Sequence, residues 1–416
     1  MHTRRIFLKS SGLALCSLGV GGTPLFLNRL VFATPAPGLF EKRPILIAIF
    51  QRGAMDGLMA VPPVEESHLT GLRPRLAMTA AGSAGEQKLL DLDNGFGLHP
   101  AFSPFLPFYK EGRLAIVHGV GSPDPTRSHF DAQDYMETGT PGRKGISSGW
   151  LNRACGLLGH EATPFRAVAM TPAMPRSLNG EEPALAISRL EEFGVSEMSS
   201  AGGTLESMYR ETTESLLHNA GTGSFEAVKL LSASNVRQYR PSPGVTYPSS
   251  PLGNSLKQIA QLIKADVGLE VGFAETGGWD THVQQGTANG TFATRARDLS
   301  AAISAFWWDM ASFQDRIVLM TMTEFGRTVR ENGSGGTDHG RASCSFILGN
   351  QVTGGMVHGT IPPLVPEALE DARDLPVTVD FRSLFAEVAG AHLGLADDKR
   401  LFPGWEGERF RVMRDL

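Results

Sequence analysis

Four short, continuous apolar runs constrain the fold of this chain most strongly, and each of them ends in a cluster of polar residues. The runs are PILIAIF (44–50), RLAIVHGVG (113–121), LEVGFAE (269–275) and RIVLMTMT (316–323). Unbroken runs of this length that are rich in Ile, Val and Leu are typical of strands buried on both faces. The runs therefore predict an α/β fold with a mostly parallel central sheet flanked by helices.

Two segments between these runs have the spacing of amphipathic helices. The segment NSLKQIAQLIKAD (254–266) precedes the third run, with Asn254 or Ser255 as the expected cap. The segment RDLSAAISAFWWDM (297–310) precedes the fourth run. Their apolar residues fall on one helical face, namely Leu256, Ile259 and Ile263 in the first and Leu299, Ile303, Phe306 and Met310 in the second. Alternating strands and helices indicate βαβ units.

The polar clusters after the runs are candidate ligands of a metal ion. In an open parallel sheet, ligands bind beyond the carboxyl ends of the strands, where loops from several strands meet. Six residues in these loops are the expected ligands: Asp56, Asp280, His282, Glu324, Asp338 and His339. Four carboxylates and two imidazoles suit one or two divalent ions, and Zn, Mn or Fe accept this mixture better than Ca does. Taken singly, each strand-end Asp is equally well explained as a helix cap or a turn residue.

The loop PDPTRSHFDAQD (123–134) holds the candidate nucleophile. We expect Ser128 to attack and Arg127 to hold an anionic substrate, because a guanidinium forms paired hydrogen bonds with such groups. The alternative is that Ser128 only caps the helix HFDAQDYME that follows it.

The amino terminus predicts export. TRRIFLKSSG contains the pair Arg4 and Arg5, as in twin-arginine signals, and Val31-Phe32-Ala33 offers small residues for cleavage. We therefore expect residues 1–33 to be a signal peptide that the twin-arginine translocase recognises, and residues 34–416 to form one domain in the periplasm or outside the cell. The alternative is an uncleaved anchor helix.

Net charge and cysteine content limit the binding partners and the disulfide bonds that we expect. Residues 1–33 hold four cations and no acid, so their removal takes the net charge from −5 to −9. An acidic chain without clustered Lys and Arg between aromatic residues is not expected to bind nucleic acid. Only Cys155 and Cys344 remain after cleavage, which excludes a disulfide framework and leaves a single bridge between them open.

Seven motifs follow one another over nearly the whole expected mature chain: FQRGAMDGLMAVPP, GLHPAF, SHFDAQDYMETG, SGWLNR, GGWDTH, TEFGRT and GTDHG. In this order they resemble a known family of exported bacterial proteins, domain-of-unknown-function family 1501. The family is placed in the alkaline phosphatase-like superfamily with sulfatases and phosphomutases. The resemblance implies an alkaline phosphatase-like fold, a metal site at the strand ends and a small anionic ester as substrate.

The resemblance also implies roles for single residues. Asp56 resembles the metal aspartate after the first strand, and Asp280 and His282 resemble an Asp and a His that share one metal. Glu324 stands where the superfamily usually has Asp, and Asp338 with His339 resembles the late Asp-His pair. Neither cysteine has the Cys-x-Pro-x-Arg context of a formylglycine sulfatase site.

Two classes of function stay open on the sequence. One is a metal-dependent hydrolase or transferase acting on phosphate or sulfate esters. The other is a non-catalytic exported binding or assembly protein that works beside another exported protein. Residues 196–247 are less patterned, and we expect them to form a small helical cap over the site.

Overall fold

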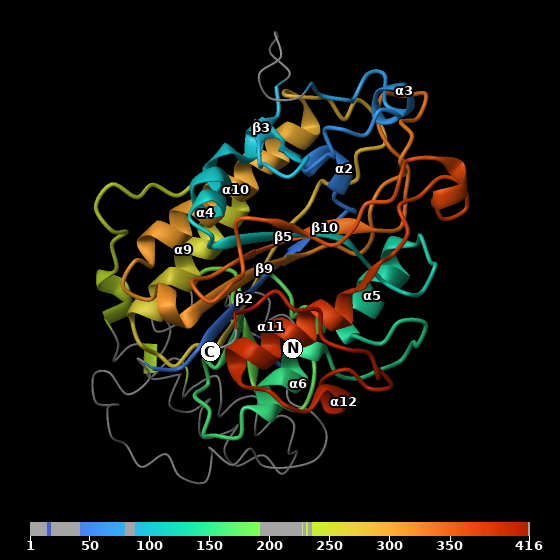
Figure 1. Ribbon diagram of the computed structural model, residues 1–416. Coiled ribbons are helices and arrows are strands. Elements are labelled where there is room, and N and C mark those ends of the chain that lie inside the picture. Colours follow the sequence, from blue (N-terminus) through green and yellow to red (C-terminus); the bar gives the residue numbers. More distant parts are fainter. Residues whose placement is uncertain are drawn as a thin grey trace, which may run out of the picture.

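A computed structural model describes residues 15–17, 42–79, 88–191, 227, 230–231 and 235–414 of this chain (Figure 1). The expected signal peptide therefore lies outside the described residues except for residues 15–17. Most of the expected cap, residues 196–247, also lies outside them.

One ten-stranded sheet forms the centre of the molecule. Nine strands follow each other across it: β1 (Leu15–Ser17), β7 (Ala184–Ala186), β6 (Ala167–Ala169), β8 (Val271–Thr276), β2 (Ile45–Gln51), β9 (Ile317–Met322), β10 (Ser343–Leu348), β5 (Leu114–Gly121) and β11 (Val357–His358). The tenth strand, β12 (Val379–Asp380), pairs with β5. The strands β2, β5, β8 and β9 coincide with the four apolar runs.

Most strand pairs in this sheet are parallel. Strand β2 runs parallel to β8 and β9, and β6 runs parallel to β7 and β8. Strand β10 is antiparallel to both β9 and β5, so β5 runs in the same direction as β9. The carboxyl ends of β2, β5, β8 and β9 therefore lie at one edge of the sheet. The predicted fold class, α/β with a mostly parallel sheet between helices, is confirmed.

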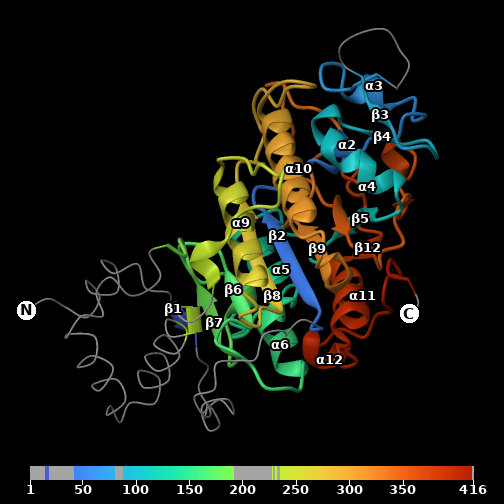
Figure 2. The same ribbon diagram turned by 90° about the vertical axis from the view of Figure 1, so that its left-hand side faces the viewer.

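Helices cover both faces of the sheet (Figures 1 and 2). Alternate side chains of β2 show why: Ile45, Ile47 and Ile49 belong to one apolar cluster, and Leu46, Ala48 and Phe50 belong to another. The first cluster includes residues of α9 (Pro251–Lys264), α10 (Thr291–Asp309), η2 (Pro100–Phe105) and α4 (Leu106–Lys110). The second includes residues of α6 (Trp150–Leu157), α11 (Phe381–Leu393) and α12 (Asp398–Leu401). Each run is continuously apolar because both of its faces are covered.

The predicted helices 254–266 and 297–310 are α9 and α10, and both begin earlier than expected. The cap of α9 is Ser250, whose side chain accepts from Gly253 N, and Pro251 occupies the first helical turn. The expected caps Asn254 and Ser255 therefore lie inside the helix. Proline fits the first turn because its missing N–H would be unsatisfied there.

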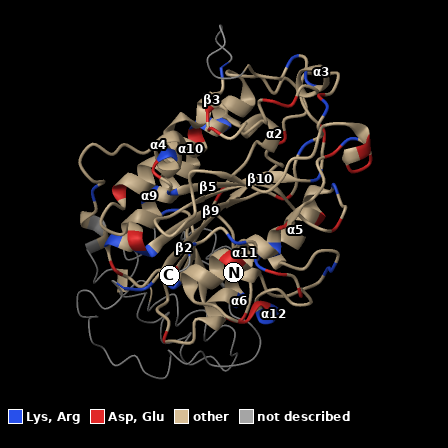
Figure 3. Cartoon of the chain, viewed as in Figure 1, with Lys and Arg blue, Asp and Glu red and all other residues tan. Residues whose placement is uncertain are grey.

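The remaining elements are short or lie around the sheet. They are α2 (Gly57–Ala60), α3 (Leu69–Leu72), β3 (Leu90–Asp91), β4 (Gly97–Leu98), α5 (His129–Thr138), η3 (Arg176–Leu178), η4 (Asn235–Gln238), η5 (Gln314–Arg316) and η6 (Pro366–Ala368). Charged residues lie mainly on helices and loops, while β2, β5, β9 and β10 contain none (Figure 3). In the part of the chain that the structure describes, no helix has the length and apolarity needed to cross a membrane.

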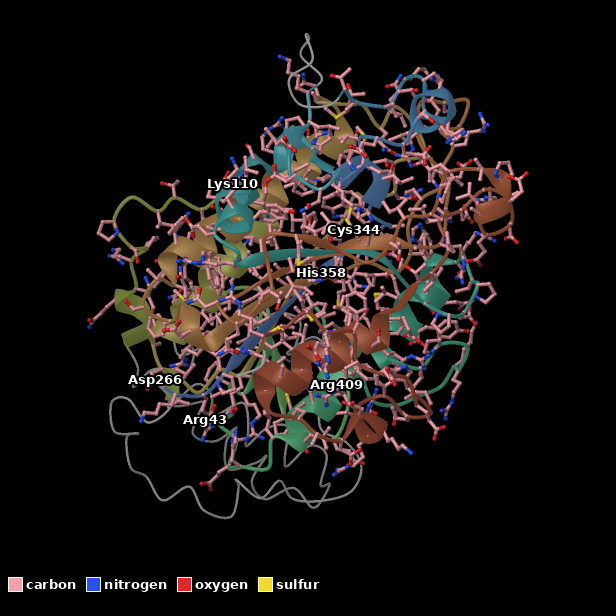
Figure 4. The ribbon with its side chains drawn as sticks, viewed as in Figure 1. Arg43, Lys110, Asp266, Cys344, His358 and Arg409 are labelled. Carbon is pink, nitrogen blue, oxygen red and sulfur yellow. The ribbon has the colours of Figure 1, made fainter. Side chains whose placement is uncertain are left out.

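Cys155 and Cys344 are separate free thiols. Cys155 is buried in α6, and Cys344 is buried in β10 (Figure 4). Burial raises the pKa of Cys155 to about 12 and also raises the pKa of Cys344. Thiols held neutral in this way are poor nucleophiles.

Candidate metal centre

Loops from β2, β5, β8 and β9 meet at the carboxyl edge of the sheet. Gly53, after β2, has φ 113°, and a Cβ at this position would lie 2.6 Å from Asp280 N. The Gly53 N–H donates to Glu324 Oε1 at 2.9 Å, and its carbonyl accepts from Arg327 Nη2 at 2.8 Å. Glycine at position 53 therefore lets three loops approach closely enough to form one site.

Three histidines and one aspartate meet at these loops. We call His129, Asp280, His282 and His339 the imidazole cluster. The Nε2 atom of His339 lies 3.0 Å from His129 Nε2 and 2.9 Å from His282 Nε2. The Oδ1 atom of Asp280 lies 3.0 Å from His282 Nε2, 3.3 Å from His339 Nε2 and 3.5 Å from His129 Nε2. His129 Nε2, His339 Nε2 and Asp280 Oδ1 form the most compact group of ligand atoms, and His282 Nε2 lies beside His339 and Asp280.

The opposite nitrogen of each ring, Nδ1, has a hydrogen-bond partner of its own. Every Nδ1 atom lies beside an oxygen that can only accept a hydrogen bond, as a carboxylate or a carbonyl does. The three pairs are His129 with Glu324 Oε1 at 2.7 Å, His282 with Asp338 Oδ1 at 2.9 Å, and His339 with the Arg127 carbonyl at 2.8 Å. A proton on Nδ1 satisfies each of these contacts, and it would leave the Nε2 of a neutral ring free to bind a metal ion.

These close approaches favour a cation. Imidazole lone pairs and a carboxylate oxygen at about 3 Å repel one another unless a proton or a metal ion lies between them. Ligand atoms of a tetrahedral zinc ion stand about 3.3 Å apart, given Zn–N bonds of about 2.0–2.1 Å. The separations of 3.0, 3.3 and 3.5 Å among His129, Asp280 and His339 fit such an ion. The cluster is therefore a candidate metal site, and His129, Asp280 and His339 form its most compact part.

Arg327 holds the carboxylate of the cluster in place. Its buried guanidinium pairs with Asp280 Oδ1 and also donates to the carbonyls of Ala54 and Trp279 at 2.9 and 3.2 Å. Burial alone would raise the pKa of Asp280, but the hydrogen bond and charge of Arg327 outweigh it, and the pKa is lowered. Asp280 is therefore ionised at neutral pH, as a metal ligand must be.

The surroundings of the cluster raise the pKa of His129 and lower the pKa of His339. The hydrogen bond from Glu324 raises the pKa of His129, although burial acts against this. Burial lowers the pKa of His339, and the charges of His129 and Arg327 lower it further. The pKa of Glu324 is lowered, because hydrogen bonds from His129 and Gln133 outweigh the effect of its burial.

The structure brings five of the six expected metal ligands together. Asp280, His282 and His339 belong to the cluster. Glu324 and Asp338 lie one step outside it, where they contact the Nδ1 atoms of His129 and His282. Such carboxylates orient the imidazole and increase its basicity.

Asp56, the sixth expected ligand, lies in a buried ion pair. Both of its oxygens face Arg73, at 2.8 and 3.1 Å, and Oδ2 also accepts from Gln285 Nε2 at 2.8 Å. The Asp56 carboxylate also caps α2 by accepting from Met59 N at 3.1 Å. All its close partners are donors, so its oxygens are used within the chain.

The expected catalytic residues lie beside the cluster. Ser128 stands at the cap position of α5, but its exposed side chain makes no cap hydrogen bond. Arg127 points to Asp374 at 2.6 Å and Asp371 at 2.7 Å, so its guanidinium is occupied by two carboxylates. Its backbone carbonyl is the group that orients His339.

His129 is the ligand that sequence reasoning missed. It lies in the polar loop after β5, next to Ser128, and starts α5. Its position matches the rule used for the other candidates, because it follows a buried strand. Phe325 packs against its ring with centroids 4.9 Å apart.

The comparisons with known proteins agree with the motifs. The family model described as "Protein of unknown function (DUF1501)" matches residues 115–404, more than half of the chain. The chain belongs to this DUF1501 family. A search of curated proteins found no match.

Several solved structures are similar to this member of the DUF1501 family. Ps i-CgsB, solved in complex with k-i-k-neocarrahexaose, is 8% identical, with a TM-score of 0.39 over 87% of this chain and 75% of that chain. The lipoteichoic acid synthase LtaP from Listeria monocytogenes is 8% identical, with a TM-score of 0.30 over 87% and 73%. A variant of the alkaline phosphatase from the Antarctic bacterium TAB5, with Mg bound, is 11% identical, with a TM-score of 0.31 over 74% and 91%.

Proposed function

We propose that this protein is an exported metal-dependent hydrolase or transferase that acts on phosphate or sulfate esters. One observation carries the proposal: the Nε2 atoms of His129 and His282 lie 3.0 and 2.9 Å from His339 Nε2, and Asp280 Oδ1 lies within 3.5 Å of all three. Such a donor set, with nitrogen predominant, fits Zn, Mn or Fe better than Ca. His129, Asp280, His282 and His339 would hold one ion, while Glu324 and Asp338 orient two of the rings.

A divalent cation in this cluster would supply Lewis-acid chemistry, by polarising the ester and neutralising charge on the leaving oxygen. Ser128 is the proposed nucleophile, because its hydroxyl is exposed beside His129 and is free of the cap bond. The Ser128 oxygen would bond to phosphorus or sulfur while the ester bond to the leaving oxygen breaks, and the leaving alcohol takes up a proton. Water, or a second alcohol in a transferase, then releases the group and restores the Ser128 hydroxyl.

Export completes the proposal. The pair Arg4 and Arg5 supports passage through the twin-arginine translocase and action in the periplasm or outside the cell. A chain with Lys at both positions should stay in the cytoplasm, which fractionation of cells with an antibody against the protein would measure. Equal export of both chains would contradict this part of the proposal.

Metal analysis of the purified protein tests the site. The native chain should retain about one equivalent of a transition metal. A chain with Asp280→Ala and His282→Ala should retain none while keeping its circular dichroism spectrum. His358→Ala is the matched control, because His358 lies on β11 and bonds to the Thr353 carbonyl, away from the cluster. Absence of metal from the native chain after incubation with Zn, Mn and Fe would remove the basis of the proposal.

The Ser128→Ala chain tests the chemistry separately. It should bind the metal as the native chain does but lose turnover of the ester that a screen of phosphate and sulfate esters identifies. Full activity of this chain would exclude Ser128 as nucleophile. Metal binding without turnover in the native chain, across the whole screen, would favour the exported binding protein instead.

A further inference from the structure

Two apolar side chains stand out on the surface beside the imidazole cluster. Among the described residues with large apolar side chains, Phe130 is 90% exposed and Val283 is 61% exposed. The other exposed members of this class, Val64, Trp308 and Met356, are 36, 44 and 42% exposed. Exposing this much of a phenylalanine to water is unfavourable, and exposed apolar groups gathered at one place mark binding sites.

The positions of Phe130 and Val283 connect them to the metal centre. Phe130 directly follows His129, and Val283 directly follows His282. Consecutive Cα atoms are about 3.8 Å apart, and the Nε2 atoms of both histidines lie within 3.0 Å of His339 Nε2. The two apolar residues therefore come from different loops, and each is next in sequence to a histidine of the cluster. We call them the apolar rim.

The charges around the centre do not favour a substrate with additional anionic groups. Each arginine that contacts the cluster residues is already paired with a carboxylate: Arg327 with Asp280, Arg127 with Asp371 and Asp374, and Arg373 with Asp374. The carboxylates of Asp280, Asp338 and Asp371 are at the same time partly exposed to solvent. A metal ion would offset the charge of one ester group, whereas further anionic groups would face these carboxylates.

We propose that the substrate of this site is an ester of an apolar alcohol or phenol, whose organic group packs on Phe130 and Val283 while its anionic group faces the metal. This inference rests on the proposed function, because it requires an anionic ester at the imidazole cluster. The proposed substrate carries one charged ester group attached to an aromatic or branched aliphatic group. Polyanionic esters, such as nucleotides or oligosaccharides with many sulfate groups, are disfavoured.

Two phosphonates that differ only in their organic group test the rim. Methylphosphonate and phenylphosphonate carry the same charged group and have no ester bond to cleave. Titration calorimetry on the metal-loaded native chain should show phenylphosphonate binding about tenfold more tightly, the effect of removing some 50–60 Å² of apolar surface from water. In the chain with Phe130→Ser and Val283→Ser, the ratio should fall to about twofold or less, while methylphosphonate affinity stays unchanged.

Trp308→Ser is the matched control. Trp308 is an exposed aromatic residue near the carboxyl end of α10, at the opposite end of the strands from the metal centre. This chain should keep the native ratio. Equal affinities for the two phosphonates in the native chain, or an unchanged ratio in the Phe130→Ser, Val283→Ser chain, would overturn the apolar rim and leave the proposed function intact. If neither phosphonate binds the metal-loaded protein, the proposed function itself fails.

Discussion

Two polar regions at the same edge of the sheet use aspartate in opposite ways. In the buried ion pair, Asp56 meets only donors, because Arg73 and Gln285 direct N–H groups at its oxygens. In the imidazole cluster, Asp280 meets Arg327 on one side and three Nε2 atoms on the other. The first region is complementary within the chain, whereas in the second a metal ion would satisfy the Nε2 atoms of neutral rings. The atoms that face a strand-end aspartate therefore decide whether it has a structural role or is a candidate metal ligand.

The largest expected effect comes from breaking the buried ion pair. Asp56→Ala should lower the free energy of unfolding by about 3–5 kcal/mol, because Arg73 stays buried without its carboxylate. Urea unfolding followed by circular dichroism measures this loss. The metal content of the folded fraction should not change.

Asp280→Ala provides the contrast to this substitution. With metal removed from both chains, its effect on unfolding should be smaller than that of Asp56→Ala, because Arg327 keeps four carbonyl acceptors. A chain with Asp56→Leu and Arg73→Met should regain much of the lost stability, since an apolar pair can replace a buried ion pair. A stable Asp56→Ala chain that binds no metal would instead make Asp56 a ligand, as the family resemblance implies.

A middle-sized effect is expected from the carboxylate that orients His129. Glu324→Gln keeps an oxygen that can accept from Gly53, His129 and Gln133 but removes the negative charge. Changes to such outer partners typically weaken metal binding by 10- to 100-fold. We expect a loss of about this size in competition with a chromophoric chelator.

Glu275→Gln is the control for this loss. Glu275 is the penultimate residue of β8 and pairs with Arg52 at 2.6 Å, without contact to an imidazole of the cluster. It should leave the metal affinity within about twofold of the native value. An unchanged affinity in Glu324→Gln would show that Glu324 has no part in orienting the ring.

The sequence predicted the sheet where residues were uniformly apolar and missed it where they were not. Strands β2, β5, β8 and β9 are continuous apolar runs, since helices cover both of their faces. Strand β10 has the sequence SCSFIL, and its two serines hide a strand whose six residues are all buried. Helix α11 is buried on most sides, so it lacks the polar stripe that marks an amphipathic helix.

For the candidate site, the sequence predicted which loops contain metal ligands but not which side-chain atoms of these loops face one another. The position after a buried strand identified Asp280, His282 and His339 as candidate ligands. His129 also follows a buried strand, but it was not among the predicted ligands. Position alone could not distinguish Asp56 from Asp280, because the partner Arg73 lies in a segment without a recognisable pattern. Which atom a side chain faces depends on loop packing, such as the contact that Gly53 permits with Asp280.

A third polar region surrounds Asp309 and differs from the other two in how it makes stability depend on pH. We expect the effect of this region to be the smallest. The buried carboxylate of Asp309 accepts from Lys264, Tyr239 and Tyr247 at 2.5, 2.6 and 2.9 Å. Burial would raise the pKa of Asp309, but the hydrogen bonds, led by that of Lys264, lower it. A carboxyl whose folded pKa lies below its unfolded value of about 3.9 stabilises the fold fully above that value. This stabilisation is lost as pH falls through the folded pKa.

Asp309→Asn should therefore change the pH dependence of the free energy of unfolding only below about pH 4. There the substitution removes the uptake of less than one proton on unfolding. The slope of the free energy of unfolding should therefore fall by less than about 1.4 kcal/mol per pH unit. Asp298→Asn, on the same helix, should keep the native slope. The imidazole cluster should behave differently, because histidine ligands release metal when they take up protons, at a pH below the ordinary histidine pKa of about 6.5 since the metal competes with the protons. Unfolding measured from pH 7 to 2 with metal present should then show a loss from the metal that begins at higher pH than the loss from carboxylates below about pH 4. If the upper loss persists in the Asp280→Ala, His282→Ala chain, it does not come from metal at the cluster, and the contrast between the two kinds of polar region would not hold.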